Sequence, residues 1–202
     1  FIYINKMARV KRKVAVPNDW SGISIKMYQD FEEIKKKNLE ENDFNLEVLS
    51  AICGIEKESA SQLEVSSLKK IFKTLSFMNN DIPDTKELIK KVEWNGRKYG
   101  IIPNLSEITM GEYIDIEEYC KDAGKNLHKI MSILYRPIVK ETKTRYSIES
   151  YSPNEEKEQE YLDFPILPSA SSLSFFFHLG KLLPSVLDRY LKKERERLRK
   201  KA

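Results

Sequence analysis

Two stretches of the chain share one pattern of apolar and polar positions. Residues 20–34 and 105–119 each place a hydroxyl residue after an isoleucine and before an amphipathic run, and both contain Tyr-x-Asp-x-Glu-Glu. A hydroxyl oxygen at such a position accepts hydrogen bonds from the free N–H groups of a first helical turn, so Ser24 and Thr109 are predicted helix N-caps. The pattern therefore predicts two helices that begin in the same way.

Each predicted helix is followed by a second apolar run, at Asn45–Cys53 and Asn126–Leu134, and these runs also resemble each other. We predict two helical hairpins, at about 20–53 and 105–134, that derive from one duplicated unit and pack about a pseudo-twofold axis. Chance convergence of two capped helices is the alternative. The predicted core-facing stripes are Met27, Phe31 and Ile34 in the first unit and Met110, Tyr113, Ile116 and Tyr119 in the second.

The segment between the two units has the pattern of a β-hairpin. Two alternating runs flank Asn95-Gly96, and these two residues tolerate the positive φ angles of a type I′ turn. A β-hairpin is therefore predicted at 88–102. A second, more exposed ribbon is predicted at 138–151, and the charged run that follows Pro153 is either a short helix or a mobile loop.

The most hydrophobic run of the chain lies near its C-terminal end. A helix is predicted from Ser169 onward, and Pro184 should bend or split it. Its three consecutive phenylalanines cover more than one face, so the helix is either central to the core or shared with a partner. If a partner is bound, the predicted partner-binding residues are Trp20, Phe175, Phe176, Phe177 and Tyr190.

These patterns predict a mainly α fold with a small β-hairpin, of the α+β class, with two related helical hairpins and a long C-terminal helix. Residues 14–191 are expected to form a single domain. Residues 1–13 would be a basic N-terminal arm, and residues 192–202 a basic helix end. Met7 reads as a natural start, so residues 1–6 are expected to lie outside the working protein.

Composition is that of a globular protein with a highly charged surface, because 41% of the 202 residues are hydrophobic and 33% are charged. No run approaches the roughly 18 apolar residues of a membrane span, so no membrane association is expected. Cys53 and Cys120 are the only cysteines and lie within predicted apolar stripes. They are predicted to be core thiols, and a zinc site is disfavoured.

The net charge of +4 is unevenly distributed. Residues 1–18 contain five bases and no acid, and residues 188–202 contain eight bases and three acids, whereas residues 19–187 contain 22 bases and 28 acids. The basic tail is either a solvated helix end, in which glutamates pair with neighbouring bases, or a site for nucleic acid or an acidic protein. The candidate nucleic-acid-binding residues are Arg195, Arg197, Arg199, Lys200 and Lys201.

No motif of known catalytic chemistry is found in the sequence. The adjacent pairs Glu32/Glu33 and Glu117/Glu118 cannot converge on one metal ion, because neighbouring helix positions point about 100° apart. His128 is predicted on the polar side of its helix, and His178 lies in an apolar run. With no glycine-rich phosphate loop, the chain is predicted not to be an enzyme, and no catalytic, metal or cofactor residue is assigned.

The order of these motifs resembles a group of small proteins of tailed bacteriophages, especially phages of Bacteroidetes-type hosts, whose genes lie among virion structural and assembly genes. The resemblance covers most of residues 14–191 and does not extend to 138–163. It is carried by Val16-Pro-x-x-Trp20, Ile23-Ser-Ile-x-x-Tyr28, Leu75-Ser-Phe-Met78, Trp94-Asn-Gly96, Ile108-Thr-Met-Gly-Glu-Tyr-Ile-Asp115, Ile133-Leu-Tyr-Arg-Pro137 and the late phenylalanine-rich helix.

Some members of the group look like tail assembly chaperones. The resemblance implies a non-enzymatic phage assembly or virion-associated protein, located in the host cytoplasm, the virion or both, with phage structural proteins as partners. A nucleic-acid-binding accessory protein that uses its basic termini is the alternative. Self-association into a homo-oligomer is compatible with either function.

Overall fold

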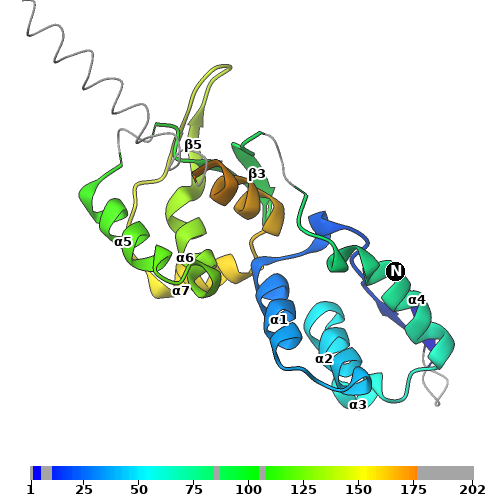
Figure 1. The fold of residues 1–202 in the computed structure, drawn as a ribbon. Helices are drawn as coiled ribbons and strands as arrows, with labels where there is room; N and C mark the ends of the chain where they lie inside the picture. Colours follow the sequence, from blue (N-terminus) through cyan, green and yellow to red (C-terminus); the bar gives the residue numbers. More distant parts are fainter. Residues whose placement is uncertain (1, 6–10, 84–86, 105–107, 177–202) are drawn as a thin grey trace, which may run out of the picture.

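The computed structural model describes residues 2–5, 11–83, 87–104 and 108–176. These residues are mostly helical, with a four-stranded antiparallel sheet, which confirms the predicted α+β class. Helices α1 to α4 form one end of the molecule, and α5 to α7 with the sheet form the other (Figure 1). Near the N-terminus, β1 (Ile2–Asn5) and β2 (Lys11–Val14) pair antiparallel, where the sequence predicted a basic arm.

The first helical hairpin consists of α1 (Ile25–Lys36) and α2 (Glu41–Cys53). The Ser24 hydroxyl accepts from the Met27 N–H, so the predicted N-cap is confirmed. Gly54 ends α2 with a φ of 62°, a left-handed conformation that glycine adopts at little cost. The elements that flank this hairpin are η1 (Trp20–Gly22), α3 (Lys57–Ala60), α4 (Val65–Leu75) and η2 (Ser76–Asn79).

The sheet has the strand order β3-β4-β5-β6 and comprises β3 (Lys91–Trp94), β4 (Arg97–Ile101), β5 (Tyr135–Glu141) and β6 (Tyr146–Ile148). The Asn-Gly turn between β3 and β4 has positive φ angles at both residues, 49° at Asn95 and 70° at Gly96, as a type I′ turn requires. The predicted ribbon at 138–151 also forms. It pairs with β4 and extends the first hairpin into one sheet, a pairing that the sequence did not predict.

The second helical hairpin consists of α5 (Met110–Cys120) and α6 (Ala123–Leu134). Thr109 and Glu112 form a reciprocal capping box at the start of α5, which confirms the second predicted cap. The short charged helix is α7 (Glu155–Glu160), followed by η4 (Tyr161–Asp163). The last described helix begins at residue 166 rather than at the predicted Ser169, and its described part ends at residue 176.

An aromatic cluster joins the sheet to the connector that follows η4. The ring of Phe164 lies 5.2 Å from Trp94 and 5.3 Å from Tyr135, measured between ring centroids. The Phe164 carbonyl also accepts a hydrogen bond of 2.9 Å from the Ile25 N–H at the start of α1. Gln29 adds a second link, since its side chain donates to the Gly124 carbonyl at the start of α6. The two ends of the molecule are thus joined through α1.

The two repeat units share helices and caps, but their matched residues have unlike environments. Tyr28 is half-buried with its ring 6.2 Å from that of Trp20, whereas Tyr113 is 56% exposed. Ile25 is fully buried, whereas the matched Met110 is 74% exposed. The prediction that Met110 and Tyr113 face the core is therefore wrong. The two units therefore share their secondary structure, but their matched residues differ in burial.

Candidate functional site

The outer face of α5 carries three exposed apolar side chains within its first two turns. Met110 is 74% exposed, Tyr113 is 56% exposed and Ile114 is 53% exposed. Their spacing of i, i+3 and i+4 places them side by side on the helix surface. In the described part of the chain, the other large hydrophobic side chains with comparable exposure are Val65 on α4 and Val139 on β5. We call Met110, Tyr113 and Ile114 the α5 apolar face.

The inner side of α5 explains why these residues point outward. The Glu112 carboxylate is buried and receives hydrogen bonds from the Thr109 N–H and hydroxyl at 2.7 and 2.8 Å. It also forms an ion pair of 2.5 Å with Arg136 at the start of β5, and both side chains are largely buried. The capping box and this ion pair fix Glu112 on the inner side, so the residues on the opposite side of α5 are left in water.

Further polar contacts attach α5 to the rest of the fold. The Tyr119 hydroxyl donates to the Glu158 carboxylate on α7 at 3.0 Å, and the Tyr151 hydroxyl donates to the Asp115 carboxylate at 2.6 Å. Burial, followed by the Glu158 interaction, raises the pKa of Tyr119 to about 12. The phenol therefore stays protonated and acts as a donor, not as a proton-transfer group near neutral pH. These contacts hold α5 rigidly, which suits a surface for docking.

Burial alone would raise the pKa of the Glu112 carboxyl group. Hydrogen bonds from Thr109 and the charge of Arg136 outweigh that effect and hold the pKa below its ordinary value of 4.5. Glu112 is therefore ionised near neutral pH, and its contribution to stability is lost as the pH falls through the folded-state value. The pair is thus an anchor for α5 and lacks the proton affinity of a general acid or base.

A small cavity lies between the sheet and the segment that leads into α7. Its volume is about 150 Å³, and its charged lining includes Arg97, Arg136, Lys157, Glu149 and Glu160. The Arg136 Nε is buried and has no hydrogen-bond partner among the described residues. It can donate to a water molecule or to an acceptor oxygen of a small ligand. Acids and bases are mixed in the lining, so the electrostatic potential in the cavity does not strongly favour either anions or cations.

The structure corrects one predicted partner-binding residue. Trp20 is 7% exposed and packs edge-on against Phe77 at 5.4 Å between ring centroids, so it belongs to the core. Phe175 and Phe176 are half-buried on the last described helix. Phe177 and Tyr190 lie outside the described residues. The predicted nucleic-acid-binding residues also lie outside them, namely Arg195, Arg197, Arg199, Lys200 and Lys201.

The prediction for the thiols is confirmed only in part. Cys53 is half-buried, and burial raises the pKa of its thiol to about 11. Cys120 is exposed at the end of α5, contrary to the prediction of a core thiol. Neither is disulfide-bonded. A thiol with a raised pKa is a poor nucleophile near neutral pH.

His128 does not lie on a polar face as predicted, because it is 7% exposed. Neither ring nitrogen makes a regular hydrogen bond to a described residue. Burial first, and then the charge of Lys129, lower the pKa of the imidazole below its ordinary value of 6.5, although the Lys125 carbonyl acts in the opposite direction. The folded protein therefore keeps His128 neutral at a pH at which the unfolded chain has begun to bind a proton.

This difference predicts that the free energy of unfolding decreases as the pH falls below about 6.5, by at most about 1.4 kcal/mol per pH unit. Urea unfolding of the full chain at pH 7.5 and at about 5.5 measures the effect. The variant His128→Met should lose most of the difference between the two conditions. An equal pH dependence in the variant and the wild type would contradict the assignment of this slope to His128.

No group of His, Cys, Asp or Glu side chains within the described ranges is arranged to hold a metal ion. The same residues include no helix that is both long enough and apolar enough to cross a bilayer. No protein-family model matches the chain, and neither a curated protein nor a solved structure matches it. Of the features described, the α5 apolar face has the clearest functional chemistry.

Proposed function

We propose that this chain is a non-enzymatic bacteriophage assembly or virion-associated protein that binds a phage structural protein through the α5 apolar face. A tail assembly chaperone is the form of this function that the sequence resemblance favours. The observation that carries the proposal is the clustering of Met110, Tyr113 and Ile114, each more than half exposed, on one face of a firmly anchored helix. Clustered exposed apolar side chains of this kind are typical of binding surfaces.

The charges beside this face indicate the chemistry of the partner segment. Glu117 and Glu118 are exposed one turn beyond Ile114, and Glu118 forms an ion pair with Lys121. Glu117 makes no ion pair with a described residue and leaves a negative charge at the edge of the α5 apolar face. The occupant that fits is an amphipathic segment of a structural protein, with apolar residues over Met110 and Ile114 and a base near Glu117.

Affinity capture from cells that produce the phage tests the proposal. The variant Met110→Gln/Tyr113→Gln/Ile114→Gln should recover identified virion structural proteins at least about tenfold less than the wild type, because central apolar contacts each contribute about 1–2 kcal/mol. The control Val65→Gln/Val139→Gln changes exposed apolar residues elsewhere and should recover them normally. Both variants should unfold close to the wild-type temperature, because surface substitutions change stability by less than about 0.5 kcal/mol.

Undiminished capture by the α5 variant would overturn the proposal. A concentration-dependent dimer that the same three substitutions abolish would also overturn it, because the face would then belong to a second copy of the chain. Capture of proteins that are not virion components would count as failure as well. The Val65/Val139 control separates loss of a specific face from a general loss of surface hydrophobicity.

A second candidate function, nucleic-acid binding through the basic termini, rests on the eight bases of residues 188–202 and the five bases of residues 1–18. Binding of this kind weakens steeply with salt, because contacts between bases and phosphates release counterions. Replacement of Arg195, Arg197, Arg199, Lys200 and Lys201 by glutamine should then abolish binding to duplex DNA in full-length protein. Binding that is insensitive to salt would exclude this candidate.

A further inference from the structure

The cavity beside α7 is built by segments that lie far apart in the sequence. Arg97 and Tyr99 both belong to β4 and line the cavity, and their spacing of two residues places their side chains on one face of the sheet. Tyr99 pairs with Pro137 of β5, and the Glu149 N–H donates to the Pro137 carbonyl at 2.9 Å. The segment after β6 is thereby held beside the cavity, and α7 lines another side of it.

The charges in the lining are balanced, and most of them have no counter-charge. The lining contains three bases and three acids. Two of these six side chains are engaged elsewhere, since Arg136 pairs with Glu112 and Glu158 accepts a hydrogen bond from the Tyr119 hydroxyl. The other four form no ion pair with each other or with any other described residue. We call these four the cavity charges: Arg97, Lys157, Glu149 and Glu160.

Two phenol rings form a fixed part of the lining. The Tyr161 hydroxyl donates to the Tyr135 carbonyl at 2.6 Å, and the ring of Tyr161 lies 6.2 Å from that of Tyr99. The Tyr99 hydroxyl makes no hydrogen bond with a described residue. Burial raises the pKa of this phenol, the charge of Arg97 lowers it, and the charges of the two cavity glutamates raise it. Charges of both signs therefore act on one protonated hydroxyl group that is able to bind a ligand.

We propose that this cavity binds a small zwitterion that carries the carboxylate and ammonium groups of a free amino acid. The planar guanidinium of Arg97 matches the two carboxylate oxygens, and Glu149 and Glu160 accept from the ammonium group. A ligand with a single charge would leave the cavity charges of its own sign without a partner. The cavity volume of about 150 Å³ is smaller than the roughly 300–1,000 Å³ of sites for drug-sized ligands, so the ligand is of amino-acid size. This inference is independent of the function proposed for α5.

Fluorine NMR of the full chain labelled with fluorotryptophan measures this binding. The ring of Trp94 lies 5.0 Å from Tyr99 and 5.1 Å from Tyr161, whereas Trp20 packs against Phe77, outside the cavity lining. Titration with L-serine should shift the Trp94 resonance to saturation with a Kd of about 1 mM and leave the Trp20 resonance in place. Glycerate, which has a hydroxyl in place of the ammonium, and serinol, which has a hydroxymethyl in place of the carboxylate, should each bind at least about tenfold more weakly.

Variants of the cavity charges assign the two ends of the ligand. Arg97→Gln should weaken L-serine binding at least about tenfold and should not weaken serinol binding, because serinol has no carboxylate. Glu149→Gln/Glu160→Gln should weaken L-serine binding to a similar degree and should not weaken glycerate binding. The matched control Arg145→Gln/Glu156→Gln removes an exposed base and an exposed acid outside the cavity, so it should bind L-serine like the wild type.

Three results would overturn the inference. The first is the absence of a saturable shift of the Trp94 resonance with either L-serine or glycine. The second is equal affinity for L-serine, glycerate and serinol, because the cavity would then not recognise both charges. The third is wild-type affinity for L-serine in either variant of the cavity charges, which would place the binding elsewhere on the protein. The spectrum of each variant without ligand shows that it is folded, because Trp20 and Trp94 are both buried.

Discussion

Replacing Arg136 by methionine is expected to lower the free energy of unfolding by about 3–5 kcal/mol. The Arg136 guanidinium pairs with Glu112 at 2.5 Å, and the two side chains are only 11% and 5% exposed. Methionine would fill much of the space but would leave the Glu112 carboxylate buried without its counter-charge. Two capping hydrogen bonds from Thr109 would remain, and they do not replace a positive charge.

Urea unfolding followed by tryptophan fluorescence measures this change, because Trp20 and Trp94 are both buried. Two control variants separate the effect of the unpaired buried charge from the effect of losing an arginine side chain. Arg97→Met removes an exposed arginine on the neighbouring strand and should cost less than about 0.5 kcal/mol. The double variant Glu112→Leu/Arg136→Met should recover most of the loss, because no unpaired charge stays buried. A loss below about 1 kcal/mol for Arg136→Met would show that the pair is effectively solvated.

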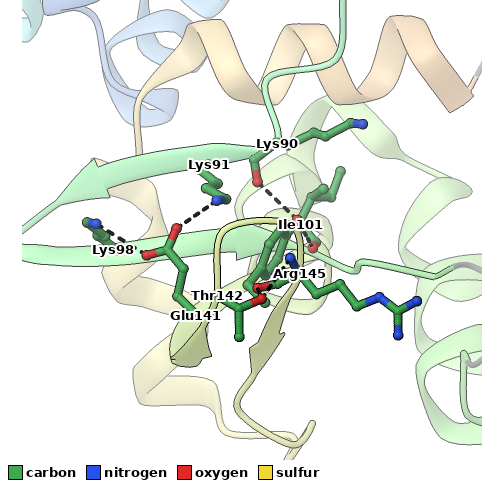
Figure 2. Close-up of polar contacts among 8 residues, drawn as sticks. Lys90, Lys91, Lys98, Ile101, Glu141, Thr142 and Arg145 are labelled. Atoms are coloured by element: carbon green, nitrogen blue, oxygen red, sulfur yellow. Dashed lines mark hydrogen bonds and ion pairs between the residues drawn. The ribbon is translucent and has the colours of Figure 1, made fainter.

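Replacing Gly100 by alanine is the second change with a large expected effect. A Cβ atom at this position would lie 2.3 Å from Cε2 and 2.9 Å from Cδ2 of the Tyr146 ring. The Tyr146 ring cannot move away freely, because its hydroxyl is hydrogen-bonded to the carbonyls of Ile101 and Lys90 (Figure 2). We expect a loss of about 2–3 kcal/mol, made up of overpacking and weakened hydrogen bonds.

A double-mutant cycle isolates this contact. Tyr146→Ala removes the ring, so a further Gly100→Ala change should then cost less than about 0.5 kcal/mol in the free energy of unfolding. The coupling between the two positions should therefore be about 2 kcal/mol. Additive effects would show that the cost of the alanine arises elsewhere, for instance in strand pairing between β4 and β5.

Local signals in the sequence predicted the elements well, because their causes are local. The caps at Ser24 and Thr109 depend on contacts within one helical turn, and the Asn95-Gly96 turn depends on the φ angles of two residues. The failures lie where distant residues decide the outcome. Glu112 is turned inward by Arg136, 24 positions further along the chain, and Met110 is therefore exposed.

The position of Trp20 and the order of the sheet also depend on residues that are distant in the sequence. Phe77 packs against Trp20 from η2 and makes it a core residue, which no neighbouring residue in the sequence indicates. Pairing of β4 with β5 joins the two predicted ribbons into one sheet, and this pairing was not predicted. The Tyr146 ring lies over Gly100, although the strand register pairs Gly100 with Lys91 and Arg136, so the sequence alone gives no signal of this contact.

Photo-crosslinking from position 114 tests most directly the claim that the α5 apolar face holds a partner segment. A photoreactive residue placed there in full-length protein, in cells that produce the phage, should crosslink to an apolar, base-containing segment of a virion structural protein. The same residue at position 65 on α4 should give no such product. Crosslinks from position 114 only to this chain itself, or to no protein, would contradict the account.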